Sequence, residues 1–142
     1  MFNTFKKVIF LDHDGVMVLN GKDFEPKAIK LLQEIIKETK CDIIISSAWR
    51  KHIPFFNIQS LYRKHGLKTP MGYTPVNISH IDDRPDIRGE EINTWLAHWP
   101  VEHWVALDDL DLSPFCENFV KCDPSYGLTE KESEEIIQIL CK

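Results

Sequence analysis

The chain has 142 residues and a mass of 16.6 kDa, which is the size of one domain and leaves little room for a second. Hydrophobic residues make up 43% and charged residues 27% of it, and these ordinary values exclude disordered and collagen-like proteins. The net charge of −5 argues against a non-specific nucleic-acid coat, which needs a strongly basic surface, but it is compatible with a local basic groove. We therefore expect a single domain over residues 1–142.

The cysteines and the N-terminal segment indicate the cellular compartment of the protein. Cys41, Cys116, Cys122 and Cys141 form no Cys-x-x-Cys pair and match no zinc-ligand spacing, so we expect isolated small hydrophobic residues. The N-terminus has no long apolar region and no small-residue cleavage site, and no apolar run approaches the ~20 residues of a membrane span. The prediction is a soluble, cytoplasmic protein with no membrane partner.

Short apolar runs alternate with helical patterns along the chain. In the first half of the chain, the sequence predicts a strand at 8–11, a helix from residue 26, a strand at 43–45 and a helix around 58–62 that ends at Gly66. A loop with at most a short strand should follow over 66–87. In the second half we expect a helix at 90–98, a strand at 104–107, a weaker strand at 118–122 and a last helix after the capping box of Thr129 and Glu132. Apolar runs without polar alternation are typical of parallel strands buried on both faces. Strand and helix in alternation predict an α/β fold with a mainly parallel sheet.

Polar side chains follow three of the predicted strands at the point where each strand ends. Asp12 and Asp14 follow the first strand, Ser46 follows the second, and Asp108 and Asp109 follow a later one. Ligands of open α/β sheets bind beyond the carboxyl ends of the strands, so these side chains should meet at one edge. One strand that ends in Asp is commonplace, because Asp also serves in turns, but three such ends together indicate a functional site.

The residue types at this edge suit phosphoryl chemistry. Of two carboxylates two residues apart, one can attack phosphorus and the other can serve as general acid and base, while Gly15 permits the tight turn that follows. Close carboxylates repel each other unless a cation lies between them, and Mg²⁺ prefers carboxylate, phosphate and water oxygens. The hydroxyls of Ser46 and Ser47 and the cations of Arg50 and Arg88 are candidate phosphate ligands.

These residues together resemble the haloacid dehalogenase (HAD) superfamily of aspartate-nucleophile phosphohydrolases. The first motif of that superfamily, an apolar run and then Asp-x-Asp-Gly, matches residues 8–16. The second, an apolar run and then Ser or Thr, matches 43–46, and the fourth, an apolar run and then paired Asp, matches 104–109. The third motif is a basic residue near the start of a helix, and we assign it to Arg88.

A closer resemblance covers nearly the whole chain. Residues 45–50, 88–96 and 127–130 form a pattern similar to the HAD domain of Swiss Army Knife RNA repair proteins. The resemblance implies a three-layer α/β/α, Rossmann-like HAD core. No substantial cap domain is expected, because only about 30 residues separate Asp14 from Ser46 and the stretch from 50 to 88 is also short.

The resemblance also implies a role for each aspartate. Asp12 would be the nucleophile that becomes an aspartyl-phosphate, and Asp14 would protonate the leaving oxygen and then activate the hydrolytic water. Mg²⁺ is the implied cofactor, held by Asp12, by the backbone carbonyl of Asp14 and by Asp108. Asp109 would be a further ligand or would lie just behind the ligands.

The predicted function is that of a Mg²⁺-dependent phosphatase of the HAD type, in which Ser46 and Arg88 hold the phosphoryl oxygens. An open site suits a phosphomonoester at an accessible end, such as an RNA or DNA terminus, and a small phosphomonoester is compatible with it too. Cations and aromatic residues between 49 and 68 are suited to a single-stranded nucleic acid, although a solvated helix face over core aromatics is the simpler interpretation.

Three alternatives stay open at this point. A phospho-acceptor signalling module also places aspartates beyond a parallel sheet, but Asp-x-Asp on the first strand and the lack of a matching late lysine count against it. A binding protein with a catalytically silent site would use the same fold. A phosphotransferase would pass the aspartyl-phosphate to an acceptor other than water.

His13 departs from the family pattern, in which the residue between the two aspartates is usually apolar or small. Because neighbouring side chains on a strand alternate, its ring should point away from the nucleophile. The simpler interpretation is a structurally bonded histidine, and the alternative is a hydrogen-bond partner that supports an acidic group.

Overall fold

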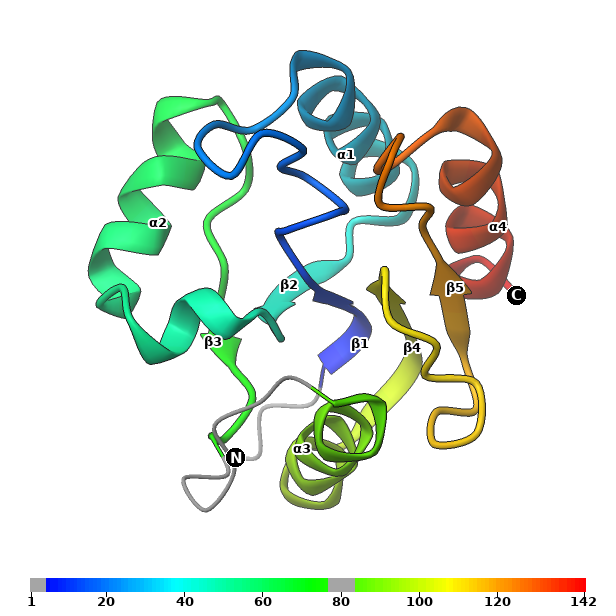
Figure 1. Cartoon of the computed structure of the whole chain (residues 1–142). Coiled ribbons are helices and arrows are strands. Elements are labelled where there is room, and N and C mark those ends of the chain that lie inside the picture. The colour runs from blue at the N-terminus through cyan, green and yellow to red at the C-terminus, as the bar shows by residue number, and fades with distance from the viewer. Residues whose placement is uncertain (1–4, 77–83) are drawn as a thin grey trace.

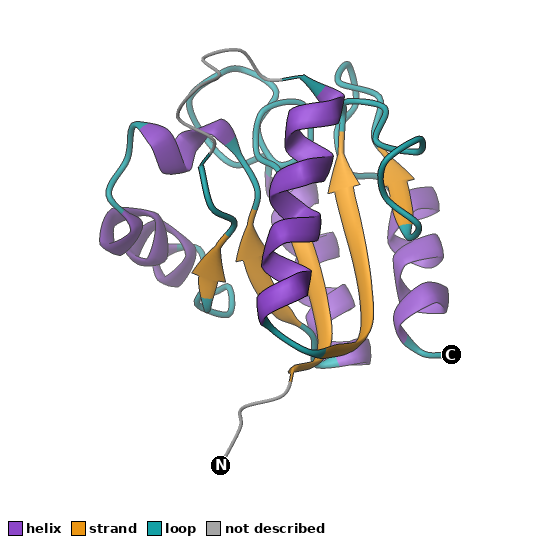
Figure 2. Cartoon of the chain, turned by 90° about the horizontal axis from the view of Figure 1, so that it is seen from below, coloured by secondary structure: helices purple, strands orange, loops and turns teal. Residues whose placement is uncertain are grey.

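The computed structural model describes residues 5–76 and 84–142. Its centre is a five-stranded sheet in the order β3-β2-β1-β4-β5. The strands are β1 (Phe5–Leu11), β2 (Asp42–Ile45), β3 (Gly72–Tyr73), β4 (Val101–Asp108) and β5 (Phe119–Lys121). Every strand pair is parallel, and the arrows share one direction in Figure 2. The predicted α/β fold with a mainly parallel sheet is confirmed.

Helices cover both faces of this sheet. The described helices are α1 (Pro26–Thr39), α2 (Phe55–Lys64), α3 (Pro85–His98), α4 (Glu130–Leu140) and the short 3₁₀ helix η1 (Ala48–Lys51). Helices α1, α2 and α4 lie on one side of the sheet, and α3 lies on the other (Figure 1). This is the three-layer, Rossmann-like arrangement that the sequence predicted.

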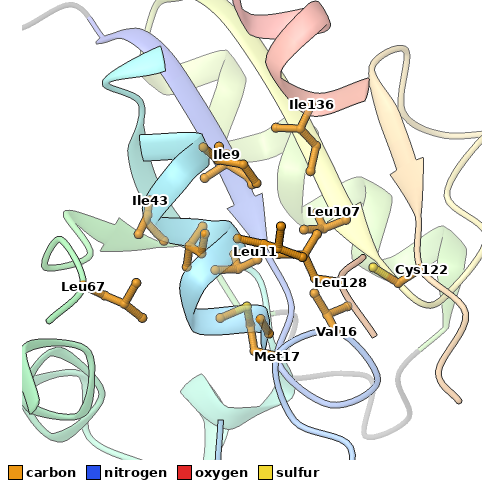
Figure 3. Close-up of a cluster of buried hydrophobic side chains, with 14 of the residues drawn as sticks. Ile9, Leu11, Val16, Met17, Ile43, Leu67, Leu107, Cys122, Leu128 and Ile136 are labelled. Carbon is orange, nitrogen blue, oxygen red and sulfur yellow. The ribbon is translucent and has the colours of Figure 1, made fainter. Parts of the chain in front are cut away.

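Alternation along the strands divides the buried side chains into two cores. In β1, Ile9 and Leu11 face α1 and α4, where they pack with residues such as Ile136 (Figure 3). Their neighbours Val8 and Phe10 face α3 instead. Each fully buried side chain of this size stabilises the fold by about 1.5–3 kcal/mol, so the central strand, apolar on both faces, anchors both layers.

Most of the predicted boundaries agree with the structure. The first helix begins at Pro26, the second ends just before Gly66, whose φ is +71°, and both hydrogen bonds of the Thr129–Glu132 capping box are present. The predicted loop over 66–87 contains the short strand β3, which the prediction allowed, but its last residues already belong to α3. Pro85 stands in the first turn of α3, a position that proline favours. Residues 77–83 of that loop lie outside the described residues.

The connections between strands are short. A loop and α1 join β1 to β2, and η1 and α2 join β2 to β3, so within the described ranges no separate domain is inserted at the points where a cap would be expected. Among the described helices, none has both the length and the apolar character required to cross a membrane. Cys41, Cys116 and Cys122 are buried and unpaired, as expected for small hydrophobic residues, whereas Cys141 is exposed because it follows the last turn of α4.

Candidate active site

The register of the three central strands sets the predicted site residues side by side. Leu11, the last residue of β1, pairs with the last residue of β2 and with the next-to-last residue of β4. Asp12, Ser46 and Asp108 therefore stand at the same level, one residue beyond these pairs. Because the preceding side chains face α1 and α4, alternation turns these three toward α3.

Helix α3 supplies a positive charge to this edge. Arg88 is buried, and its Nη1 lies 2.5 Å from Oδ2 of Asp108 and 3.4 Å from Oδ1 of Asp12. Both aspartates are buried as well. The cation that the sequence assigned to the third motif thus contacts carboxylates from two neighbouring strands.

The electrostatics of the two buried aspartates favour a further cation. Burial raises the pKa of Asp12 well above its ordinary value, the carboxylate of Asp108 raises it further, and Arg88 opposes this shift only in part. The pKa of Asp108 is also raised, again chiefly by burial and against the effect of Arg88. One arginine therefore does not balance the carboxylates at this edge, and a divalent cation would favour their ionised form.

Three of the carboxylates are close enough together to share a metal ion. Asp12, Asp108 and Asp109 each offer an oxygen, and these oxygens lie within 4.8 Å of one another. An all-oxygen donor set suits Mg²⁺ rather than a metal that prefers nitrogen or sulfur. Gly15 has a φ of +81°, and a Cβ there would lie 2.5 Å from Oδ2 of Asp109, so only glycine lets the backbone approach this cluster. The residues present fit the predicted magnesium ion.

The hydroxyl of Ser46 is buried at this edge without a hydrogen-bond partner among the described residues. An unsatisfied buried polar group costs about 1–3 kcal/mol, so such groups are rare in folded proteins. Ser46 adjoins Asp12 through the register of β1 and β2. A hydroxyl free to donate beside a candidate nucleophile suits an oxygen of a bound phosphoryl group.

Asp14 lies apart from the three clustered carboxylates. Its side chain is exposed, and its Oδ2 accepts a hydrogen bond of 3.2 Å from the indole Nε1–H of Trp49. The predicted contribution of Asp14 to the metal site runs through its backbone carbonyl and stays a prediction. Sequence reasoning missed the contact with Trp49, although the segment of residues 45–50 that carries this tryptophan was part of the family pattern.

Two residues predicted to bind phosphate, Ser47 and Arg50, have partners within the protein. The hydroxyl of Ser47 accepts the backbone N–H of Trp49 at 3.1 Å and so caps η1. Arg50 forms a buried ion pair of 2.5 Å with Glu91. It also donates to backbone carbonyls of Ser46, Ser47 and Thr74. Arg50 thus joins the ends of β2 and β3 to α3. Phosphate binding by Ser47 and Arg50 stays a prediction, and neither residue is among the phosphate ligands proposed below.

His13 is fully buried on the other side of the strand from the nucleophile. Its Nε2 lies 2.6 Å from the hydroxyl of Tyr62, and its ring packs against that of Trp49 with centroids 4.3 Å apart. Burial, with a smaller effect of Arg88, lowers the pKa of His13 to about 3, so the ring is neutral at pH 7. The interpretation of a structurally bonded histidine is confirmed. The described contacts include none between its ring nitrogens and an acidic group.

The neutral state of His13 makes the stability of the fold depend on pH. In the unfolded chain the imidazole keeps its ordinary pKa near 6.5, so protons favour unfolding as the pH falls from 6.5 toward 3. Between pH 7 and pH 4 we expect the wild type to lose about 3 kcal/mol more of its free energy of unfolding than His13→Phe loses. Urea titrations of both proteins across this range measure the difference, and parallel pH profiles would contradict it.

A hollow of about 610 Å³ lies elsewhere, between β3 and α3. It is lined mainly by apolar and aromatic side chains, including Met71, Tyr73, Trp95 and Trp99. None of the predicted site residues lines it. The strand edge is therefore the candidate active site because of the chemistry of its side chains.

An all-parallel sheet in this order, with Asp-x-Asp after its central strand and Ser and Asp after the two neighbours, defines a Rossmann-like core of the HAD type. The family model for the HAD domain in Swiss Army Knife RNA repair proteins matches residues 8–133, and the chain belongs to that family. The resemblance predicted from the motifs is confirmed, and membership indicates hydrolase or phosphatase activity at the level of the superfamily. No curated protein and no solved structure gives a significant match to the chain.

Proposed function

We propose that the protein is a Mg²⁺-dependent phosphatase that works through an aspartyl-phosphate on Asp12. The observation that carries the proposal is the set of groups around this carboxylate. Arg88 contacts it, the unpaired hydroxyl of Ser46 adjoins it, and Asp108 and Asp109 bring further carboxylate oxygens to it. A nucleophile, two phosphate ligands and a metal-binding cluster thus share one edge of the sheet.

In the first step, an oxygen of Asp12 attacks phosphorus while Asp14 gives its proton to the departing oxygen. The Nη atoms of Arg88 and the hydroxyl of Ser46 hold the phosphoryl oxygens and stabilise the charge that develops on them. In the second step, Asp14 takes a proton from water, the water oxygen attacks phosphorus, and phosphate leaves with Asp12 regenerated. A magnesium ion held by Asp12, Asp108 and Asp109 would screen the carboxylates from the anionic substrate.

The substrate we propose is a phosphomonoester at an accessible end, such as an RNA or DNA terminus. The short connections after β1 and β2 and the exposed position of Asp14 support an open site. The description of the family as a domain of RNA repair proteins supports a nucleic-acid end. A cytoplasmic location is also part of the proposal, supported by cysteines that form no disulfide.

The test is release of phosphate from p-nitrophenyl phosphate and from 3′-phosphorylated oligonucleotides, with Mg²⁺ and with a chelator. We expect release that requires Mg²⁺ and that Asp12→Asn eliminates. Wild type that is as inactive as Asp12→Asn on both substrates would overturn the proposal.

Ser46→Ala should separate substrate binding from stability. Because the hydroxyl lacks a partner in the described structure, we expect its removal to leave the free energy of unfolding unchanged or slightly higher. The dissociation constant for inorganic phosphate should rise about 10-fold, which corresponds to one hydrogen bond to an anion of about 1.4 kcal/mol. Calorimetric titration and urea denaturation measure the two effects, with exposed Ser125→Ala as the matched control. Unchanged phosphate affinity in a less stable Ser46→Ala would contradict this role.

A further inference from the structure

The indole of Trp49 is placed to control the orientation of the Asp14 carboxylate. Its Nε1–H donates to Oδ2 of Asp14 at 3.2 Å. Among the described side-chain hydrogen bonds, this one alone reaches that carboxylate, which is otherwise exposed. A carboxylate on a loop, held at one oxygen, keeps its other oxygen, Oδ1, for the exchange of a proton.

The indole itself is fixed from behind by a stack of rings. It lies against His13, with centroids 4.3 Å apart, and against Phe24, at 6.0 Å. His13 is held in turn by the hydroxyl of Tyr62. The backbone of Trp49 is fixed by the Ser47 cap of η1. A donor on so constrained a ring can hold Asp14 without losing much conformational entropy at each turnover.

We infer that Trp49 is a positioning residue that orients Asp14 for proton transfer. The inference rests on the proposed function and specifies how the carboxyl group of Asp14, the proposed general acid, is oriented. With Oδ2 engaged by the indole, the transferable proton resides on Oδ1. It passes from there to the leaving oxygen in the first step, and Oδ1 accepts a proton from water in the second. Loss of the indole N–H leaves the carboxyl group present but free to rotate.

Trp49→Phe removes the N–H and retains an aromatic ring in the stack. The diagnostic is kcat/KM for two substrates that differ in their need for an acid. The alkoxide of a 3′-phosphorylated oligonucleotide or of 2-phenylethyl phosphate must be protonated as it leaves, whereas p-nitrophenolate leaves without help. We expect kcat/KM to fall about 10-fold for the alkyl phosphates, a fraction of the ~10²–10⁴-fold provided by general acid catalysis, and to change less than about 2-fold for p-nitrophenyl phosphate.

Trp95→Phe is the matched control, because it makes the same substitution in the core on the other face of the sheet, away from Asp14. We expect it to change kcat/KM for both classes of substrate by one common factor. An equal loss on both classes in Trp49→Phe, or no loss on either, would overturn the inference while the wild type remains an active phosphatase. A wild type that hydrolyses neither class would overturn the proposed function itself.

A spectroscopic measurement tests the contact without turnover. In ¹⁵N-labelled protein, the indole N–H resonance of Trp49, assigned through its absence in Trp49→Phe, should move when Asp14→Ala removes the acceptor. The indole resonances of Trp95 and Trp104, which pack on the other face of the sheet, should not move. If the chemical shift of the Trp49 indole N–H did not change in Asp14→Ala, the inference would be overturned whatever the activity of the enzyme.

Discussion

Asp12→Asn should lower kcat by at least about 10⁴-fold, because it removes the nucleophile rather than a group that assists it. The variant should still fold, and its free energy of unfolding at pH 7 should equal or exceed that of the wild type. Burial raises the pKa of Asp12, so the ionised carboxylate is a cost to the folded state at neutral pH, and the neutral amide removes that cost. Arg88 keeps its contact with Asp108 in the variant.

The control for this experiment is Asp23→Asn, which makes the same chemical change at an exposed position of the loop before α1. It should retain full activity. Phosphate release and urea denaturation on the three proteins provide the comparison. If Asp12→Asn retained activity within about 10-fold of wild type, Asp12 would not be the nucleophile.

Arg50→Met should destabilise the fold by about 3–5 kcal/mol, because it removes the cation from a buried ion pair with the carboxylate of Glu91. The side chains of this pair are only 1% and 5% exposed, and their atoms lie 2.5 Å apart. The loss should also release the carbonyl groups that Arg50 binds at the ends of β2 and β3. Urea denaturation at pH 7 measures the change in the free energy of unfolding.

The exposed ion pair of Lys27 and Glu130 is the matched comparison. Lys27→Met breaks a contact of similar length, 2.9 Å, at the surface, where solvent screens the charges, and should change stability little. The double variant Arg50→Met with Glu91→Leu should regain most of the stability lost by Arg50→Met, since it removes both charges of the buried pair. If Arg50→Met cost no more than Lys27→Met, the buried pair would not tie α3 to the sheet.

The parts of the site that the sequence predicted well are those determined by local pattern and topology together. Apolar runs that end in Asp12, Ser46 and Asp108 identify strand ends, and parallel strands bring such ends to one edge. The capping box at Thr129 predicted the start of α4 because it needs only four consecutive residues. Alternation along β1 predicted that His13 faces away from the nucleophile.

The contacts that the sequence did not predict depend on distances set by tertiary packing. The sequence predicted Arg50 as a phosphate ligand beside Ser46, but it did not predict the buried ion pair of Arg50 with Glu91 of α3, which joins two packed layers. The bond from Trp49 to Asp14 joins two loops that follow different strands, and no spacing along the chain encodes it. The start of α3 was predicted five residues late, because the apolar repeat begins only after its first turn.

The central claim, that Asp12 is the nucleophile, is tested most directly by trapping its phosphorylated form. Turnover of a 3′-phosphorylated oligonucleotide with Mg²⁺ is quenched in acid, and borohydride then reduces any acyl phosphate, which converts the aspartate concerned to homoserine. Peptide mass spectrometry should find homoserine at position 12, and only when substrate and Mg²⁺ were both present. Phosphate release with homoserine at another aspartate, or with none in a protein that turns over, would contradict the assignment of Asp12.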